Sequence, residues 1–326
     1  MKVEVLPDFE ALGPERWNSL LDRSRTASVF LTWPWQTGWI RAFAPGASLE
    51  LLAASDDTGQ LIGLLPLHET AGVRRLIGGA DVSDYLDLIA VAGSEGEVWE
   101  ALLEHRAASP APWELRGIRA ASPTLEILAR LGRERGLEPR TEREERCPVL
   151  ALPGSWPAYL QGLDGKDRHE LRRKIRRLER ELPGSRVWSE SQAAGWDTAL
   201  SRFLALHRLS KVGKARFMDD RMEGFFRAVT ADLAREGWAR LWFLEGPQGP
   251  VASFLCVEYA GAVGLYNSGF DPAHARLAPG IVLLAHVIRD AIDREIAVFD
   301  FLRGEEPYKY SFGPAATDLY AIRLEG

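Results

Sequence analysis

The amino-acid sequence predicts an α/β protein built of two domains, and three observations support this fold class. The chain has 326 residues, which exceeds the size at which a single hydrophobic core stops growing. Helix patterns alternate with strand patterns through its second half. Residues 51–65 and 241–255 also share a strand, turn, strand layout with a glycine at the same point of each turn, which is a weak internal repeat.

The predicted elements follow from the spacing of apolar residues. Several short apolar runs, rich in β-branched and aromatic residues and bounded by turn residues, are typical of strands. Residues 281–289 are instead apolar around two helical turns and follow Pro279 and Gly280, which is typical of a helix start. For the second half we predict helices at about 194–209, 219–236 and 279–294 and strands at 239–245, 250–259, 262–269, 296–302 and 318–324.

The boundary between the two domains is expected where helical and strand periodicity is interrupted. Pro153, Gly154 and Pro157 make such an interruption. We therefore predict an N-terminal domain over residues 1–150 and a C-terminal domain over residues 151–326.

Composition restricts the class of protein and its location. Charged residues make up 26% of the chain, hydrophobic residues 46%, and there are 11 tryptophans, which is typical of a soluble globular protein with a large core. The net charge of −6 argues against a protein whose whole surface binds nucleic acid. Because the N-terminus lacks a signal-peptide pattern and no apolar run could span a bilayer, we expect a cytoplasmic protein without an integral membrane segment. Cys147 and Cys256 have no metal-ligand spacing, so neither zinc nor a disulfide framework is expected.

The segment 300–313 is the strongest candidate for a site. It places chargeable side chains and tyrosines directly after an apolar strand, and ligands of α/β proteins often gather at the carboxyl ends of strands. The sequence predicts that Asp300, Arg303, Tyr308 and Lys309 face one cavity. An ion-pair cluster that only stabilises the turn is an equally weighted alternative.

A second candidate site precedes the helix at 279–294. The first backbone N–H groups of a helix lack intrahelical partners, and together with the helix dipole they attract phosphate. Arg276 adds a positive charge beside them. An ordinary strand-to-helix turn is the alternative. The residues predicted to hold a pyrophosphate here are Arg276, Leu277, Ala278, Pro279, Gly280 and Ile281.

The order of the elements resembles a GNAT acyltransferase domain. In that fold, the loop between the fourth strand and the following helix binds the pyrophosphate of an acyl-coenzyme A, usually through an Arg/Gln-x-x-Gly-x-Gly/Ala sequence. Arg276 and Gly280 lie in such a loop here, and Pro279 departs from that spacing. The resemblance implies an acyl-coenzyme A co-substrate, no metal, and a mixed, mostly antiparallel sheet flanked by helices.

A closer resemblance lies within that superfamily. The helix start at Arg276-x-x-Pro279-Gly280, followed by the segment 300–309, resembles the bacterial FemAB-like branch, in particular cellulose-biosynthesis-protein-like acetyltransferases. The segments 30–35 and 166–181 are similar to that branch too. This resemblance covers most of the chain and implies two tandem GNAT-like domains.

A basic amphipathic helix is predicted at 164–182. Its apolar residues Leu171, Ile175, Leu178 and Leu182 form one stripe at helical spacing, and lysines and arginines dominate the remainder. One interpretation is a solvated helix that docks through its stripe and carries weak surface ion pairs. The other is a cationic face that binds phosphate from coenzyme A, from a lipid-linked or nucleotide-linked substrate, or from a transfer RNA.

An acceptor pocket is predicted from residues in both halves of the chain. Asp84 and Tyr85 lie in a polar loop after two glycines, and Trp33 belongs to an aromatic segment whose near-helical spacing is more typical of core. The end of the strand at 262–269 contributes further polar groups. The residues predicted to bind substrate are Tyr266, Asn267, Ser268, Trp33, Asp84 and Tyr85.

The sequence and its resemblance together predict an acyl-coenzyme A dependent N-acyltransferase. An amine of a sugar, a cell-envelope precursor or a small metabolite would attack the thioester carbonyl directly. Asp300 is predicted to take or relay the amine proton and Tyr308 to protonate the departing thiolate, while Lys309 and Arg303 stabilise negative charge. Two alternatives stay open: FemAB-type transfer from aminoacyl-tRNA to a peptidoglycan precursor, and a binding protein without catalysis.

Overall fold

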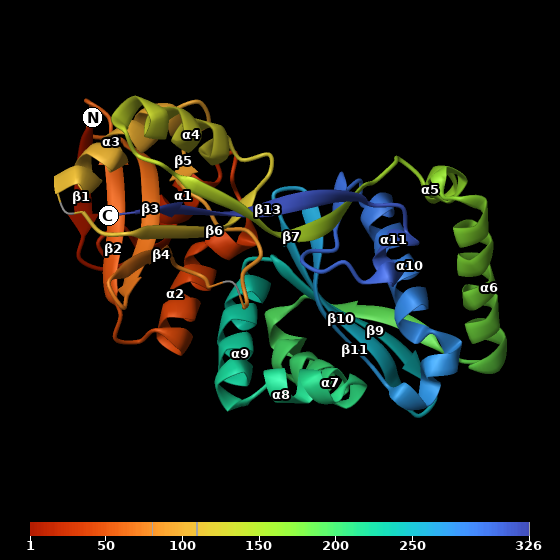
Figure 1. Cartoon of the computed structure of the whole chain (residues 1–326). Helices are drawn as coiled ribbons and strands as arrows, with labels where there is room; N and C mark the ends of the chain where they lie inside the picture. The colour runs from red at the N-terminus through yellow and green to blue at the C-terminus, as the bar shows by residue number, and fades with distance from the viewer. Residues whose placement is uncertain (80, 109, 326) are drawn as a thin grey trace. The chain divides into compact units, whose positions relative to one another are not determined.

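The computed structural model describes residues 1–79, 81–108 and 110–325 and divides into two compact units (Figure 1). Unit 1 comprises Met1–Arg146 and Thr317–Gly326, and unit 2 comprises Cys147–Ala316. The last strand of the chain therefore belongs to unit 1, although it lies beyond the predicted boundary at residue 150. Within the described ranges, no helix combines the length and the apolar character needed to cross a membrane.

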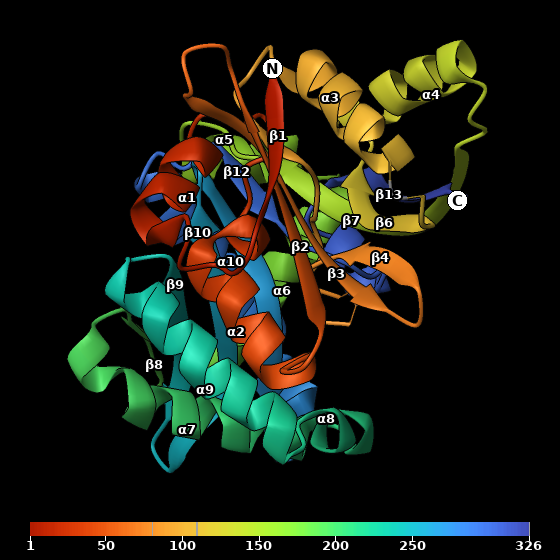
Figure 2. The same ribbon diagram turned by 90° about the vertical axis from the view of Figure 1, so that its left-hand side faces the viewer.

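Unit 1 contains a mixed, mostly antiparallel sheet. Its strands are β1 (Lys2–Leu6), β2 (Ser48–Ser55), β3 (Leu61–Thr70), β4 (Val73–Leu76), β5 (Ile89–Ala90), β6 (Trp113–Arg119) and β13 (Ala315–Leu324). They are ordered β1-β2-β3-β4-β6-β13, with β5 paired to β3, and among the described residues of this unit only the β4–β6 pair is parallel. The helices are α1 (Gly13–Leu21), η1 (Val29–Leu31), α2 (Trp33–Phe43), α3 (Glu95–Ala108) and α4 (Pro123–Arg135). In Figure 2, α1 and α2 lie on one side of this sheet and α3 and α4 on the other.

Unit 2 repeats this layout with a second mixed sheet. Its strands are β7 (Arg140–Ala151), which crosses the unit boundary along the chain, β8 (Arg186–Glu190), β9 (Ala239–Gly246), β10 (Gly249–Tyr259), β11 (Ala262–Phe270) and β12 (Val298–Asp300). They are ordered β7-β12-β11-β10-β9-β8, and of the pairings between these strands over the described ranges only β11–β12 is parallel. The helices are α5 (Trp156–Gly162), α6 (Gly165–Glu181), α7 (Ala193–Ser210), α8 (Val212–Phe217), α9 (Asp220–Arg235), η2 (Pro272–Leu277), α10 (Pro279–Asp293) and α11 (Pro307–Tyr310).

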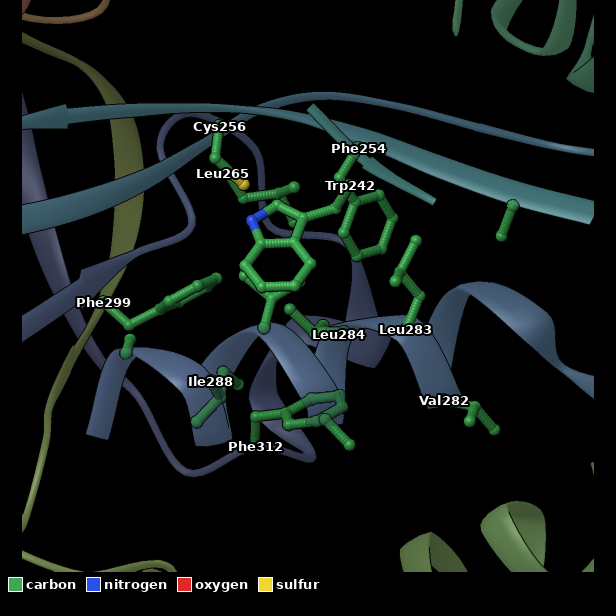
Figure 3. Packing of buried hydrophobic residues seen from close by; sticks show 14 of the residues in the cluster. Trp242, Phe254, Cys256, Leu265, Val282, Leu283, Leu284, Ile288, Phe299 and Phe312 are labelled. Carbon is green, nitrogen blue, oxygen red and sulfur yellow. The ribbon is translucent and has the colours of Figure 1, made fainter. Parts of the chain in front are cut away.

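The strands of unit 2 are apolar because helices cover both faces of its sheet. Figure 1 shows α7 and α9 on one side of β9, β10 and β11 and α10 on the other, with α6 beside α10. On β9, Trp242 belongs to the core cluster that packs on α10, while the neighbouring Phe243 stacks on Trp188 with ring centroids 4.5 Å apart. Figure 3 shows the α10 side of this core, where Trp242 lies over Leu284 and Ile288. Such two-sided burial explains the continuous apolar runs in the sequence.

The predicted elements of the second half are present, with one difference. The strand predicted at 296–302 is limited to Val298–Asp300. The carboxylate of Asp300 accepts a hydrogen bond from the backbone N–H of Leu302 at 2.8 Å, and Leu302 and Gly304 adopt positive φ angles of 56° and 104°. These angles turn the backbone out of the extended conformation. The strand therefore ends before them, although the apolar run of the sequence continues to Leu302.

Candidate functional site

The sheet of unit 2 opens between β11 and β12. The two strands pair in parallel over only three residues each, Ala262–Gly264 with Val298–Asp300. β11 continues to Phe270 while β12 ends, and β11 carries an irregularity at Tyr266. Within the described part of unit 2, the stretch of β11 after Gly264 pairs with β10 alone. An open strand edge presents N–H and C=O groups to which an extended, amide-bearing ligand can add.

The helix α10 starts shortly after the end of β11. Ala278, with φ 50° and ψ 50°, turns the chain into the helix, and its side chain makes no capping hydrogen bond. At Gly280, a Cβ atom would meet no heavy atom within 4 Å, so there is open space beside the first turn at this residue. This N-terminus therefore has the open approach and the dipole that an anionic group requires.

Arg276 is less available to a ligand than its sequence position suggests. Its side chain is 69% exposed, but its guanidinium lies 2.7 Å from the carboxylate of Glu181 at the end of α6. The neighbouring Leu277 is buried in the core. The predicted pyrophosphate loop thus consists of a paired arginine, a core leucine, an alanine whose N–H is bonded to Ala275, a buried proline and the open space at Gly280.

Lys309 is a structural anchor in the segment after β12. Its side chain is buried, and its ammonium group donates hydrogen bonds to the carbonyl oxygens of Arg303 at 2.7 Å and Gly304 at 3.0 Å. It also lies 2.9 Å from the carboxylate of Glu306. The three N–H donors of the ammonium match these three partners, so Lys309 holds the segment 303–309 together.

Tyr308 lies in the short helix α11 and borders a pocket. Its side chain is 37% exposed, and burial, reinforced by the nearby Glu306 carboxylate, raises the pKa of its hydroxyl. The phenol is therefore protonated at neutral pH. Tyr308 and Ile281 border the same pocket of about 280 Å³, which connects two of the predicted sites. The lining residues are Asp167, Glu170, Leu171, Lys174, Ile281, Pro307, Tyr308, Ser311 and Phe312.

The end of β11 contacts helices α7, α8 and α9 through each of its predicted substrate-binding residues. Tyr266 stacks on Phe226 with centroids 5.6 Å apart, and the side-chain oxygen of Asn267 lies 2.9 Å from Nε2 of His207. The Ser268 carbonyl oxygen accepts a hydrogen bond from Lys214, whose Nζ is also 3.1 Å from the Ser268 hydroxyl. Lys214 is not among the residues predicted from the sequence, because no local pattern links α8 to β11.

The predicted residues of unit 1 are explained largely by packing. Tyr85 is buried beneath the guanidinium of Arg119, which lies 5.2 Å from the ring centroid. The Trp33 ring packs against Phe9 and Trp17 with centroids 5.5 and 5.7 Å away. Asp84 is partly exposed in the same loop as Tyr85.

The basic helix extends over Gly165–Glu181, as predicted. Leu171 and Leu178 are buried and Ile175 and Leu182 are packed on the same core, so the apolar stripe docks α6 on unit 2. The exposed side includes a row of basic residues at helical spacing, namely His169, Arg172, Arg173, Arg176 and Arg180. Carboxylates pair with two members of this row, Glu170 with Arg173 at 2.7 Å and Glu181 with Arg180 at 3.1 Å.

Comparison with known families identifies the class of protein. Residues 165–310 match the model of the acetyltransferase (GNAT) domain family. A comparison with curated protein sequences found no match. Residues 165–310 of the second unit therefore form a GNAT acyltransferase domain, as the resemblance predicted, and the protein is an N-acyltransferase.

Solved structures extend the likeness in fold to both units. FemX is similar over 98% of this chain and 97% of its own, with 10% identity and a TM-score of 0.66. L-PGS from Bacillus licheniformis is similar over 95% and 91%, with 12% identity and a TM-score of 0.63. A conserved protein from Bacteroides thetaiotaomicron is similar over 99% and 100%, with 11% identity and a TM-score of 0.64. The predicted architecture of two tandem GNAT-like domains, close in fold to FemAB-like proteins, is confirmed.

His207 is expected to make the stability of the protein depend on pH. Burial, with a smaller contribution from Lys214, lowers the pKa of this histidine to about 4. An unfolded histidine has a pKa of about 6.5, so the unfolded chain binds the proton more tightly. The stability that neutral His207 contributes to the folded protein is fully present above pH 6.5 and is lost as the pH falls towards 4. About 2 kcal/mol of the free energy of unfolding is lost at pH 5.

Urea unfolding at pH 7 and pH 5 measures this effect. The variant His207→Gln lacks the titrating group, so its stability should fall by about 2 kcal/mol less than that of the wild type over this interval. Equal losses in the two proteins would show that His207 does not carry the pH dependence.

Proposed function

We propose that the protein transfers an acyl group from an acyl-coenzyme A to a primary amine. The observation that carries this proposal is the open edge of β11 after Gly264, which leads along the chain to the uncapped start of α10. The amide-bearing arm of coenzyme A suits an open strand edge, and its pyrophosphate suits the positive end of the α10 dipole at Gly280. Such a donor implies a cytoplasmic protein. The acceptor would be an amine of a sugar, of a cell-envelope precursor or of a small metabolite.

The proposed reaction is direct attack of the neutral amine on the thioester carbonyl. Asp300, partly exposed at the end of β12, would take or relay the amine proton. Tyr308, which remains protonated at neutral pH, would give a proton to the departing thiolate. Because its N–H donors are already used within the protein, Lys309 has a positioning role here, in place of the predicted charge stabilisation. Arg303, whose carbonyl Lys309 binds, keeps the predicted charge-stabilising role.

A second candidate donor is an aminoacyl-tRNA, as the resemblance to FemAB-like proteins implies. The exposed basic row of α6 favours this donor, because a row of positive charges attracts the phosphate backbone of a nucleic acid without reading its sequence. This donor predicts binding of transfer RNA that weakens steeply with salt, and no response to coenzyme A thioesters. A scaffold without catalysis would bind neither donor.

Calorimetric titration with acetyl-coenzyme A and longer acyl-coenzyme A species tests the proposal. The variant Gly280→Glu puts a carboxylate in the open space beside the first turn of α10 and should weaken thioester binding by at least about tenfold, through repulsion of the pyrophosphate. Arg276→Ala should have a smaller effect, because Glu181 already neutralises that arginine.

Gly224→Glu is the matched control for that titration. A Cβ at Gly224, on the distant face of unit 2, also meets no heavy atom within 4 Å, and the same charge is added there. It should leave the affinity unchanged. If wild-type protein binds no thioester, or if both glutamate variants bind equally well, the acyl-coenzyme A proposal is wrong.

A further inference from the structure

Lys214 brings an amine to the open edge of β11. It extends from α8 to Ser268, four residues beyond the last residue of β11 that pairs with β12. Its Nζ donates to the Ser268 carbonyl oxygen and lies 3.1 Å from the Ser268 hydroxyl. The amine therefore lies on the stretch of strand to which the proposed donor would add.

Lys214 differs from the other lysines of the site in its partners. Lys309 and Lys174 each form an ion pair with a glutamate, whereas the oxygens bound by Lys214 are a carbonyl and a hydroxyl. Over the described residues, no carboxylate lies within 4.0 Å of its Nζ. An ammonium without a carboxylate partner, partly removed from water, is poorly stabilised relative to the neutral amine.

The charges that face Lys214 favour its neutral form. Burial, together with the positive charge of Lys211, lowers the pKa of Lys214 to about 8, and Glu306 opposes the shift only weakly. Glu306 is itself paired with Lys309, and His207 is neutral at pH 7.5. At pH 7.5 about a quarter of Lys214 is then the free amine, against about 0.1% of an exposed lysine.

We propose that Lys214 is a self-acylation site, at which the protein receives the acyl group of its own thioester donor. The inference rests on the proposed function, since the donor must lie along β11. The neutral ε-amine attacks the thioester carbonyl, a C–N bond forms and the C–S bond breaks. Coenzyme A leaves as the thiol and takes the proton that the nitrogen loses.

Acylation at this position has a consequence for the site. The product is an amide, which is too stable to pass the acyl group to a second amine, so this modification stands apart from direct transfer to the acceptor. It removes the positive charge at Ser268 and adds bulk at the strand edge. Acylated protein should therefore bind its donor more weakly.

Peptide mass spectrometry after incubation of the full-length protein with acetyl-coenzyme A tests the proposal. Lys214 should gain one acetyl group at least about tenfold faster than the exposed Lys211, three residues away. The rate at Lys214 should level off above pH 8, whereas the rate at Lys211 should keep rising. Lys214→Arg should remove the modification, and Gly280→Glu should slow it by blocking the donor.

Acetic anhydride provides the matched comparison, because it does not need a binding site. Its rate at each lysine follows the free-amine fraction, so it too should label Lys214 faster than Lys211, but Gly280→Glu should leave this labelling by the anhydride unchanged. Equal labelling of the two lysines by acetyl-coenzyme A, or labelling that Gly280→Glu leaves unchanged, would overturn the proposal. Absence of labelling in protein that binds acetyl-coenzyme A would overturn it as well, while leaving the proposed function intact. Absence of thioester binding would instead refute the proposed function itself.

Discussion

Replacing Gly269 by alanine should destabilise unit 2 by about 3 kcal/mol or more, because α7 lies directly against β11 at this residue. A Cβ at Gly269 would lie 2.6 Å from the backbone nitrogen of His207 and 2.7 Å from the carbonyl carbon of Leu206. Both are main-chain atoms of a buried helix, so neither can rotate away. The helix would have to move off the sheet, with loss of core packing.

Urea unfolding of the full-length chain measures this effect, and Gly213→Ala is its control. A Cβ at Gly213 meets no heavy atom within 4 Å, and helix propensity favours alanine in α8 by up to about 1 kcal/mol. The two substitutions add the same methyl group, but Gly269→Ala should lower the free energy of unfolding and Gly213→Ala should raise it. A loss below about 1 kcal/mol at Gly269 would mean that α7 and β11 are separated more easily than their contact indicates.

The close approach at Gly269 also matters for the site. It fixes the distance at which His207 meets Asn267, and on the next residue the backbone N–H of Phe270 donates to the Ser210 hydroxyl at 3.3 Å. The open edge of β11 is therefore held from one face by α7. A ligand that adds to this edge meets a strand whose position is already determined, which lowers the conformational cost of binding.

Local patterns in the sequence were sufficient for the longer helices of unit 2 and for strands β9, β10 and β11. The apolar runs at 239–245 and 250–259 and the start of α10 at Pro279 correspond to structure because they depend on neighbours along the chain. The length of strand β12 was overestimated because that prediction also relied on the local apolar pattern alone. Its apolar character continues to Leu302, while the positive φ angles that end it leave no mark on hydrophobic periodicity.

The candidate site was less predictable, because its contacts join residues far apart in the sequence. The pairing of Arg276 with Glu181 and the contact of Lys214 with Ser268 each depend on how helices pack on the sheet. The partners of Lys309 are local, yet its burial is a tertiary property that the motif does not encode. Residue types could therefore identify the segment 300–309 as a candidate site, but they could not distinguish a structural residue from a catalytic one.

Replacing Lys309 by methionine should cost unit 2 about 2–4 kcal/mol and abolish transfer, since one residue holds the whole segment that carries Tyr308. Methionine keeps the length and the buried volume of the side chain but donates no hydrogen bond. The carbonyl oxygens of Arg303 and Gly304 would lose their donor, at a cost of about 1–3 kcal/mol for each buried group that stays unsatisfied. The measurements are urea unfolding and turnover of acetyl-coenzyme A with an amine acceptor.

Glu306→Gln separates the carbonyl contacts from the ion pair. The Glu306 side chain is 56% exposed, so its pairing with Lys309 should contribute less than about 1 kcal/mol, and the variant should remain near wild-type stability. If Lys309 acts only as a structural anchor, Lys309→Met loses stability and turnover together, because Tyr308 and Arg303 are released from their positions. A Lys309→Met protein with unchanged stability and no turnover would contradict this. The ammonium would then act on the reacting groups themselves, and the charge-stabilising role predicted from the sequence would be restored.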